Sequence, residues 1–236
     1  MFEGERLKQL QQFFLNDYDR IAAEFQKRSP DENFMNFHHL IPQVYDVVTN
    51  RTLVEHLNDL IGQDVICFIS QFINKKPGDP RKTVWHQDST YNGMDSRSAI
   101  VWLAVTDATV DNGCMFFIPG THKPAGQLDF EMKPTTPESF GGHKIVDSEV
   151  RGTPAPIELK AGHAVFFSDK LLHSAGGNST TDRTRAGFTM SFINADVEPK
   201  SMHNIASVIC SGRDRQNHWA PHYSRPREES VREGCK

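Results

Sequence analysis

The sequence has few cysteines, and they do not form the patterns of a zinc site or a disulfide framework. Its four cysteines lie at widely separated positions among 236 residues, with no C-x-x-C pair. Closely spaced pairs are typical of structural zinc sites, and regular sets are typical of small secreted domains. We therefore expect reduced thiols and neither kind of site.

Long apolar runs and an excess of one charge are also missing. The longest apolar stretches, such as 65–69 and 99–105, are far shorter than the roughly 18 residues that cross a bilayer. Lys and Arg total 26 against 30 Asp and Glu, for a net charge of -4, so nothing favours nucleic acid or an anionic membrane as partner. No apolar segment follows Met1, so we expect no secretory signal and a cytoplasmic location.

The sequence does contain enough apolar material for a sizeable core. Hydrophobic residues make up 37% of the chain, and 16 of them are Phe. At about 150 residues per domain, with all-β domains often longer, one domain over 1–236 is the simplest organisation. We expect a helical part at about 1–62, a β core at about 63–195, and a polar tail or lid at about 196–236.

Two helices are expected before the β core. Over residues 4–27, apolar side chains recur at three- and four-residue steps, which is typical of an amphipathic helix. A second helix begins after Thr49 or Asn50, either of which can cap it, and ends at Gly62. Both helices are expected to pack outside a sheet.

Short runs rich in Val, Ile and Phe begin at Asp64 and are separated by Gly, Pro and Asn. They predict antiparallel strands at about 64–73, 83–90, 98–106, 113–119, 143–150, 155–160, 163–169 and 185–194. Eight such strands without intervening helices favour an all-β jelly roll with flanking helices. The stretch 123–142, with three prolines, is expected to be a long surface loop.

The segment His86-Gln87-Asp88 is the first part of a candidate metal site. Residues i and i+2 of an extended strand point to the same face, so His86 and Asp88 can reach one ion. One such pair is weak by itself, but His173 follows 87 residues later in a His-Ser-Ala-Gly-Gly-Asn segment. Two imidazoles and one carboxylate make the facial triad of non-haem Fe(II) oxygenases, which leaves coordination positions open for cosubstrate and dioxygen.

Arginines follow His173 by 10 and 12 residues, at Arg183 and Arg185. If the next strand runs back beside His173, one of them can lie near the metal. There a planar guanidinium can hold a distal carboxylate by two hydrogen bonds. A 2-oxoglutarate site needs such a carboxylate clamp.

Over roughly residues 50–195 the sequence resembles the phytanoyl-CoA dioxygenase family of Fe(II)/2-oxoglutarate oxygenases. The matching segments occur in the family's order and at similar separations: Phe72 to Pro77, His86 to Asp88, Asp111 to Cys114, Ile118 to Lys123, and His173 to Arg185. The resemblance implies a double-stranded β-helix, also called a jelly roll or cupin-like fold. It also implies iron ligation by His86, Asp88 and His173.

The same resemblance implies residues of the cosubstrate site. Arg185 is the better candidate to bind the C5 carboxylate of 2-oxoglutarate, and Arg183 is the alternative. Gln71 and Trp102 match positions that line the cosubstrate pocket in relatives, although Trp102 is equally suited to the core. Halogenating relatives have a small residue in place of Asp88, so the carboxylate here favours hydroxylation or a related oxidation. No catalytic residue beyond the metal ligands is expected.

The expected activity is oxidation of an unactivated C–H bond in a small-molecule metabolite. Fe(II), 2-oxoglutarate and dioxygen would take part, with release of succinate and CO2 and with ascorbate added in vitro. Desaturation, demethylation or cyclisation would use the same ligands. The alternative is a non-oxidative cupin-like protein that binds a metal or small ligand on the same fold. The sequence leaves the prime substrate and the oligomeric state open.

Overall fold

The computed structural model describes residues 1–28, 35–92, 97–123, 127–200 and 205–227. The chain divides into two compact units. The first comprises Met1–Phe72, Ser96–Trp102 and Phe188–Lys236, and the second comprises Ile73–Asp95 and Leu103–Gly187. In the described part of the chain, no helix has both the length and the apolar character needed to cross a membrane.

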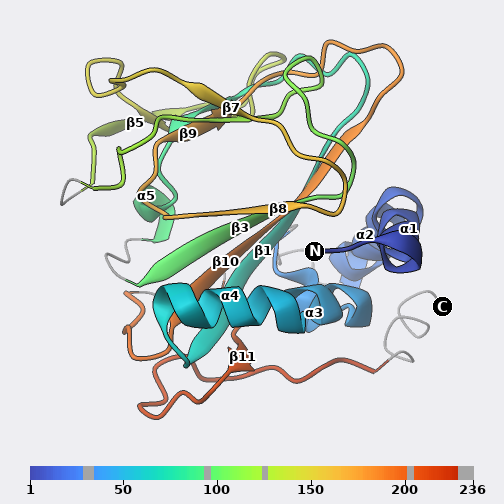
Figure 1. Cartoon of the computed structure of the whole chain (residues 1–236), viewed down its shortest axis with the longest axis vertical. Coiled ribbons are helices and arrows are strands. Elements are labelled where there is room, and N and C mark those ends of the chain that lie inside the picture. Colours follow the sequence, from blue (N-terminus) through green and yellow to red (C-terminus); the bar gives the residue numbers. More distant parts are fainter. Residues whose placement is uncertain (29–34, 93–96, 124–126, 201–204, 228–236) are drawn as a thin grey trace. The chain divides into compact units, whose positions relative to one another are not determined.

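The first unit contains the helices before the sheet (Figure 1). They are α1 (Gly4–Gln12), a π-helical turn (Phe13–Asp17), α2 (Tyr18–Arg28), a 3-10 turn (Phe37–His39), α3 (Pro42–Val48) and α4 (Arg51–Ile61). The helix predicted over 4–27 is therefore confirmed as α1 and α2, which are joined by a π turn. That turn changes the helical register locally.

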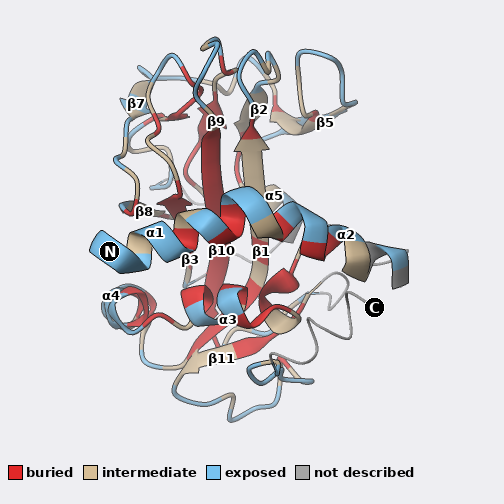
Figure 2. Ribbon diagram, turned by 90° about the vertical axis from the view of Figure 1, so that its right-hand side faces the viewer, coloured by how far each residue is buried: buried red, intermediate tan, exposed pale blue. Residues whose placement is uncertain are grey.

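Aromatic side chains anchor this long helix to strands of the first unit. The ring of Phe14 is 1% exposed and lies 4.9 Å from the ring of Phe72 and 5.1 Å from that of Phe188. Burying one such side chain contributes about 1.5–3 kcal/mol. Figure 2 shows the helices exposed on one side and buried on the other, as the apolar periodicity predicts.

Helix α4 has the ends that the sequence predicts. The Asn50 side chain accepts a hydrogen bond from the Leu53 amide at 3.2 Å, and Gly62 ends the helix with a positive φ. A Gly at this position adopts that backbone conformation without steric cost. Leu53 and Leu57 are completely buried.

Among the residues that the structure describes, the strands form three sheets. The largest has the order β11-β1-β10-β3-β8, the second β2-β9-β4-β7, and the third β5-β6. The strands are β1 (Val65–Lys75), β2 (Thr83–His86), β3 (Ser98–Ala104), β4 (Met115–Phe117), β5 (Phe130–Lys133), β6 (Gly142–Ile145), β7 (Ala155–Ile157), β8 (Ala164–Phe167), β9 (His173–Ala175), β10 (Arg185–Asn194) and β11 (Val208–Ser211).

All eight predicted strands are present, although several are shorter than expected. The strand expected at 83–90 ends at His86, and helix α5 (Ser89–Asn92) begins three residues later. Part of the expected surface loop 123–142 is strand β5, which pairs with β6 from Phe130 opposite Ile145 to Lys133 opposite Gly142. That long-loop prediction was wrong for 130–133, while 124–126 lie outside the described residues.

The described part of the C-terminal tail is packed in the first unit. Strand β11 pairs with β1, and Trp219 is fully buried with its ring 5.5 Å from that of Phe68. The indole N–H of Trp219 donates to the Val197 carbonyl at 2.9 Å. Residues 205–227 are therefore part of the folded unit, and the last nine residues lie outside the described part.

Candidate metal centre

The three predicted metal ligands lie together in the second unit. His86 is the last residue of β2 and His173 is the first of β9, and these antiparallel strands place the two residues opposite each other. Asp88 follows in the turn that leads into α5. Strand pairing thus brings together two segments that are 87 residues apart in the sequence.

The ligand atoms of His86, Asp88 and His173 all lie within 4.8 Å of one another. One Asp88 oxygen is 3.4 Å from His86 Nε2, and the other is 3.8 Å from His173 Nε2. Both imidazoles are buried, whereas the Asp88 side chain is 20% exposed. Two nitrogens and one oxygen at this spacing can hold one divalent ion on one side and leave its other positions open.

Backbone hydrogen bonds fix the orientation of both imidazoles. The Nδ1–H of His86 donates to the Val84 carbonyl, and that of His173 donates to the Leu171 carbonyl, each at 2.8 Å. The proton on Nδ1 leaves the Nε2 lone pair available to a metal. In each case the acceptor lies two residues earlier in the chain.

The charges within the site favour the protonation states that metal binding requires at Asp88 and His173, but not at His86. Burial, followed by the neighbouring His86, lowers the pKa of His173 to about 4. Burial alone would raise the pKa of Asp88, but His173 and His86 outweigh it and the pKa is lowered. Burial would likewise lower the pKa of His86, but its hydrogen bond and attraction to Asp88 raise it. An ionised carboxylate and a neutral imidazole are suitable ligands without further proton loss.

Gln87 lies between two of the ligands in the sequence, and its side chain is hydrogen-bonded to two loops near the site. Its amide nitrogen donates to the Lys170 carbonyl at 2.7 Å, and its amide oxygen accepts from the Leu128 amide at 3.0 Å. The side chain is 1% exposed. The sequence pattern predicts no role for Gln87; its place between two ligands is the available signal.

The two candidate arginines differ in their surroundings. Arg185 begins β10, is 2% exposed, and donates from Nε to the Gly113 carbonyl at 3.1 Å. The Arg183 side chain is 45% exposed and forms an ion pair with Asp111. Burial lowers the pKa of Arg185 to about 10, so the guanidinium remains charged at neutral pH.

The Asp111-Asn112-Gly113-Cys114 turn supports Arg185. The Asn112 side chain accepts from the Thr109 amide at 2.8 Å and donates to the Asp107 carbonyl at 2.9 Å. Gly113 has a φ of 89°, and a Cβ there would lie 2.6 Å from the Gly176 carbonyl oxygen. This backbone approach requires Gly, and it fixes the carbonyl that receives the Arg185 N–H.

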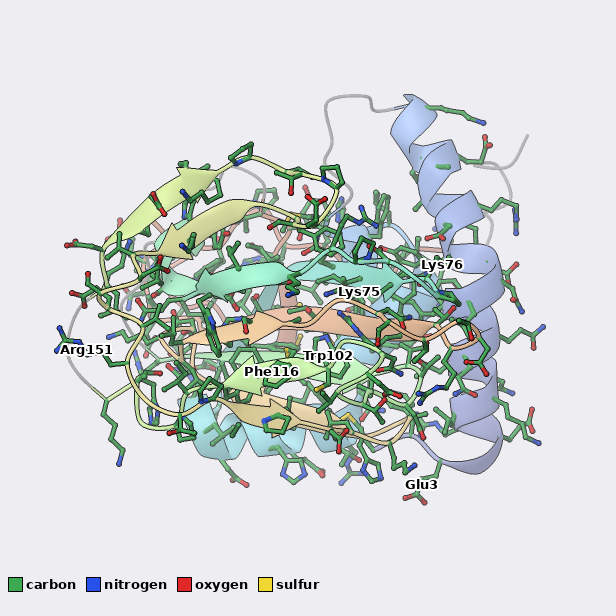
Figure 3. The ribbon with its side chains drawn as sticks, turned by 90° about the horizontal axis from the view of Figure 1, so that it is seen from above. Glu3, Lys75, Lys76, Trp102, Phe116 and Arg151 are labelled. Atoms are coloured by element: carbon green, nitrogen blue, oxygen red, sulfur yellow. The ribbon has the colours of Figure 1, made fainter. Side chains whose placement is uncertain are left out.

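Gln71 and Trp102, the other predicted cosubstrate residues, belong to the first unit, whereas the triad belongs to the second. Gln71 is half-buried in β1. Trp102 is 2% exposed in β3 (Figure 3), which suits a core residue. Their assignment to the cosubstrate pocket stays a prediction.

Comparison with family models gives a match to "Phytanoyl-CoA dioxygenase (PhyH)" over residues 4–187. The chain belongs to the phytanoyl-CoA dioxygenase family. Members are Fe(II)/2-oxoglutarate dioxygenases, and the chain carries their facial triad at His86, Asp88 and His173. The family resemblance seen in the sequence is confirmed.

Two curated family relatives illustrate the level of similarity. The chain is 25% identical over 200 residues to phytanoyl-CoA dioxygenase domain-containing protein 1 homolog of Caenorhabditis briggsae, covering 75% of this chain and 68% of that protein. It is 27% identical over 207 residues to the peroxisomal phytanoyl-CoA dioxygenase of Bos taurus, covering 81% and 56%. The chain thus spans little more than half the length of the bovine enzyme.

Solved structures confirm the family fold. The non-heme monooxygenase ThoJ matches with a TM-score of 0.72 at 19% identity, covering 96% of this chain and 85% of that one. EctD from S. alaskensis, solved with 2-oxoglutarate and 5-hydroxyectoine, matches with a TM-score of 0.62 at 18% identity, covering 85% and 72%. The fold is the double-stranded β-helix with N-terminal helices that the sequence predicts.

Proposed function

We propose that the protein uses Fe(II), 2-oxoglutarate and dioxygen to oxidise a C–H bond of a small-molecule metabolite. The observation that carries this proposal is the convergence of His86, Asp88 and His173, with both Nδ1 atoms held by backbone carbonyls and both Nε2 atoms close to the Asp88 carboxylate. Bound iron would supply the dioxygen chemistry. The protein would orient the reactants around it and limit access of water.

The proposed reaction consumes one 2-oxoglutarate, one dioxygen and one substrate C–H group. It gives succinate, CO2 and the hydroxylated substrate, with one oxygen atom entering succinate and the other entering the product. Hydroxylation is favoured because Asp88 keeps the coordination position that chloride would need in a halogenase. The names of the relatives make acyl-CoA thioesters the first candidates to assay.

Arg185 is proposed to bind the distal carboxylate of 2-oxoglutarate. Its support is its burial, its retained charge, and the position of its Nε on the Gly113 carbonyl. A guanidinium binds a carboxylate through parallel N–H···O hydrogen bonds, which are strong in a buried site. Arg183 is less suited because it already pairs with Asp111 near solvent.

Conversion of 2-oxoglutarate to succinate tests the function. We expect the wild-type protein, supplied with Fe(II), ascorbate and a panel of acyl-CoA thioesters and other metabolites, to form succinate, measured by mass spectrometry. The His173→Ala variant should lose at least about 100-fold of this activity, because the removal of a metal ligand leaves an incomplete triad. His163→Ala is the matched control, since His163 is exposed in the same unit.

Two outcomes would count against the proposal. Equal succinate formation by wild type and His173→Ala would remove His173 from the metal centre. A wild-type protein that binds metal but neither binds nor consumes 2-oxoglutarate would favour the non-oxidative cupin-like alternative. Anaerobic addition of 2-oxoglutarate to the Fe(II)-loaded protein tests the second outcome directly. Chelation of the iron by 2-oxoglutarate gives a weak visible charge-transfer band, and a protein that does not bind 2-oxoglutarate gives none.

A further inference from the structure

Lys75 is a buried lysine that the proposed function does not use. It is the last residue of β1, and its side chain is completely buried. Nζ donates a hydrogen bond to the Gly176 carbonyl and lies 5.3 Å from the centre of the Phe140 ring. The next residue, Lys76, is exposed, so the two neighbouring lysines differ in their surroundings (Figure 3).

Positive charge exceeds negative charge around Lys75. Arg185 is close enough to lower its pKa, and the carboxylate of Asp79 is already engaged by Arg81 through contacts of 2.9 and 2.6 Å. Within the part of the chain that the structure describes, Lys75 makes no ion pair with an acidic side chain. A buried cation without an anionic partner is costly, because its lost hydration is only partly replaced.

Lys75 and Arg185 are anchored to adjoining pieces of backbone. Arg185 donates to the Gly113 carbonyl and Lys75 to the Gly176 carbonyl. Gly113 and Gly176 are in close contact, since a Cβ on Gly113 would lie 2.6 Å from the Gly176 oxygen. Two basic side chains bound to the carbonyls of two glycines in contact form a small cluster inside the second unit.

This cluster lies on the segment that carries His173. Gly176 comes three residues after His173, directly after β9, and its amide donates to the Cys114 carbonyl at 3.2 Å. Three residues of extended chain cover about 10 Å. The two cations are therefore anchored close, along the chain, to a predicted metal ligand.

We propose that Lys75 is a second cation of the 2-oxoglutarate site and shares the C5 carboxylate with Arg185. This inference rests on the proposed function. The ammonium group keeps the carboxylate on the Arg185 side of the pocket and adds a charge-assisted hydrogen bond. Lys75 would thereby make the site selective for 2-oxo acids with a second carboxylate.

The charge balance supports this role. Burial, followed by the proximity of Arg185, lowers the pKa of Lys75 to about 7, while Asp79 and Cys114 oppose the shift and Arg81 adds to it. A carboxylate between the two cations would favour the charged lysine and relieve the repulsion. The cluster has the sign and the burial that suit an anionic ligand.

Isothermal titration of the anaerobic Fe(II)-loaded full chain tests the role of Lys75. The probes are 2-oxoglutarate and 2-oxopentanoate, which has the same carbon chain without the second carboxylate. We expect Lys75→Met to weaken 2-oxoglutarate binding by about tenfold or more. It should change 2-oxopentanoate binding by less than about threefold, and Lys76→Met should leave both affinities unchanged.

A structural role of Lys75 gives a different result. If the only role of Lys75 is to hold the Gly176 backbone in place, Lys75→Met weakens the binding of both probes equally. That result would overturn the proposal. If Lys75→Met does not fold, Lys75→Gln replaces it, because the amide retains a donor for the Gly176 carbonyl without the charge. Lys75→Arg, which keeps the charge, should retain selectivity for 2-oxoglutarate better than Lys75→Gln does.

The same titrations separate this proposal from the function on which it rests. If the wild-type protein binds Fe(II) but not 2-oxoglutarate, the proposed function fails. If the wild type binds 2-oxoglutarate and Lys75→Met binds it equally well, only the role of Lys75 fails. Selective loss of 2-oxoglutarate binding in Lys75→Met supports both.

Discussion

At the scale of single residues, Arg185 and Arg183 are two positions apart but have different electrostatic surroundings. A carboxylate at Arg185 would be held away from water, where a charge-assisted hydrogen bond is strong. At Arg183 the same contact would compete with solvent and with Asp111. Surface ion pairs of that kind contribute about 0–1 kcal/mol.

The difference gives a prediction for 2-oxoglutarate binding. We expect Arg185→Ala to weaken binding to the Fe(II)-loaded protein by about 30-fold or more, because loss of a buried charged partner costs roughly 2–5 kcal/mol. Arg183→Ala should remain within about twofold of the wild type. Anaerobic calorimetry measures both dissociation constants. The reverse order of losses would make Arg183 the carboxylate ligand.

The sequence could identify the triad because its residue types and order carry the chemistry directly. It left Arg185 and Arg183 open, since burial distinguishes them and burial depends on the fold. Lys75 was missed for a similar reason. Lys75 and Lys76 are chemically identical neighbours, and only strand alternation and packing place one inside and the other outside.

At the scale of elements, the β5–β6 hairpin is fastened beside the metal centre by stacked rings. The His143 ring lies 4.1 Å from that of Tyr91, with an interplanar angle of 5°, and 4.4 Å from that of Phe130. The Tyr91 hydroxyl also accepts from the His143 amide at 2.8 Å. Tyr91 belongs to α5, three residues after Asp88, and its ring is 6.1 Å from that of His86.

Removal of the central ring should loosen the hairpin. We expect His143→Ala to lower the local stability of β5 and β6 by about 1–2 kcal/mol, because each aromatic pair contributes roughly 0.5–1.5 kcal/mol and these rings are partly exposed. Amide hydrogen exchange of residues 130–133 and 142–145 should accelerate by about five- to thirtyfold. His163→Ala is the control. Unchanged exchange in His143→Ala would show that backbone pairing alone holds the hairpin.

The elements that were predicted from sequence have strong local signals. Helix α4 has an Asn cap, an apolar stripe and a terminal Gly, and β10 is a ten-residue run that matches its predicted bounds. Strands β5 and β9 have only four and three residues, and pairing with a partner strand defines them. Helix α3 is rich in valine, a poor helix former, and its buried side chains stabilise it instead.

At the scale of the whole molecule, the facial triad joins distant parts of the chain. A metal that binds His86, Asp88 and His173 closes a segment of more than 80 residues, and the unfolded chain cannot offer the three ligands together. The three ligands therefore come together only when the chain folds. It aligns two short motifs on paired strands so that a metal can bind across them.

Metal binding is therefore expected to stabilise the folded protein. At a free Fe(II) concentration of 100 times the dissociation constant, the unfolding free energy should rise by about 2.7 kcal/mol relative to the metal-free protein. Anaerobic denaturant titrations with and without Fe(II) measure the difference. His173→Ala should lose most of this stabilisation, whereas His163→Ala should retain it. Equal stabilisation of wild type and His173→Ala would mean that the metal binds elsewhere, because His173 is the ligand that β9 contributes to the triad.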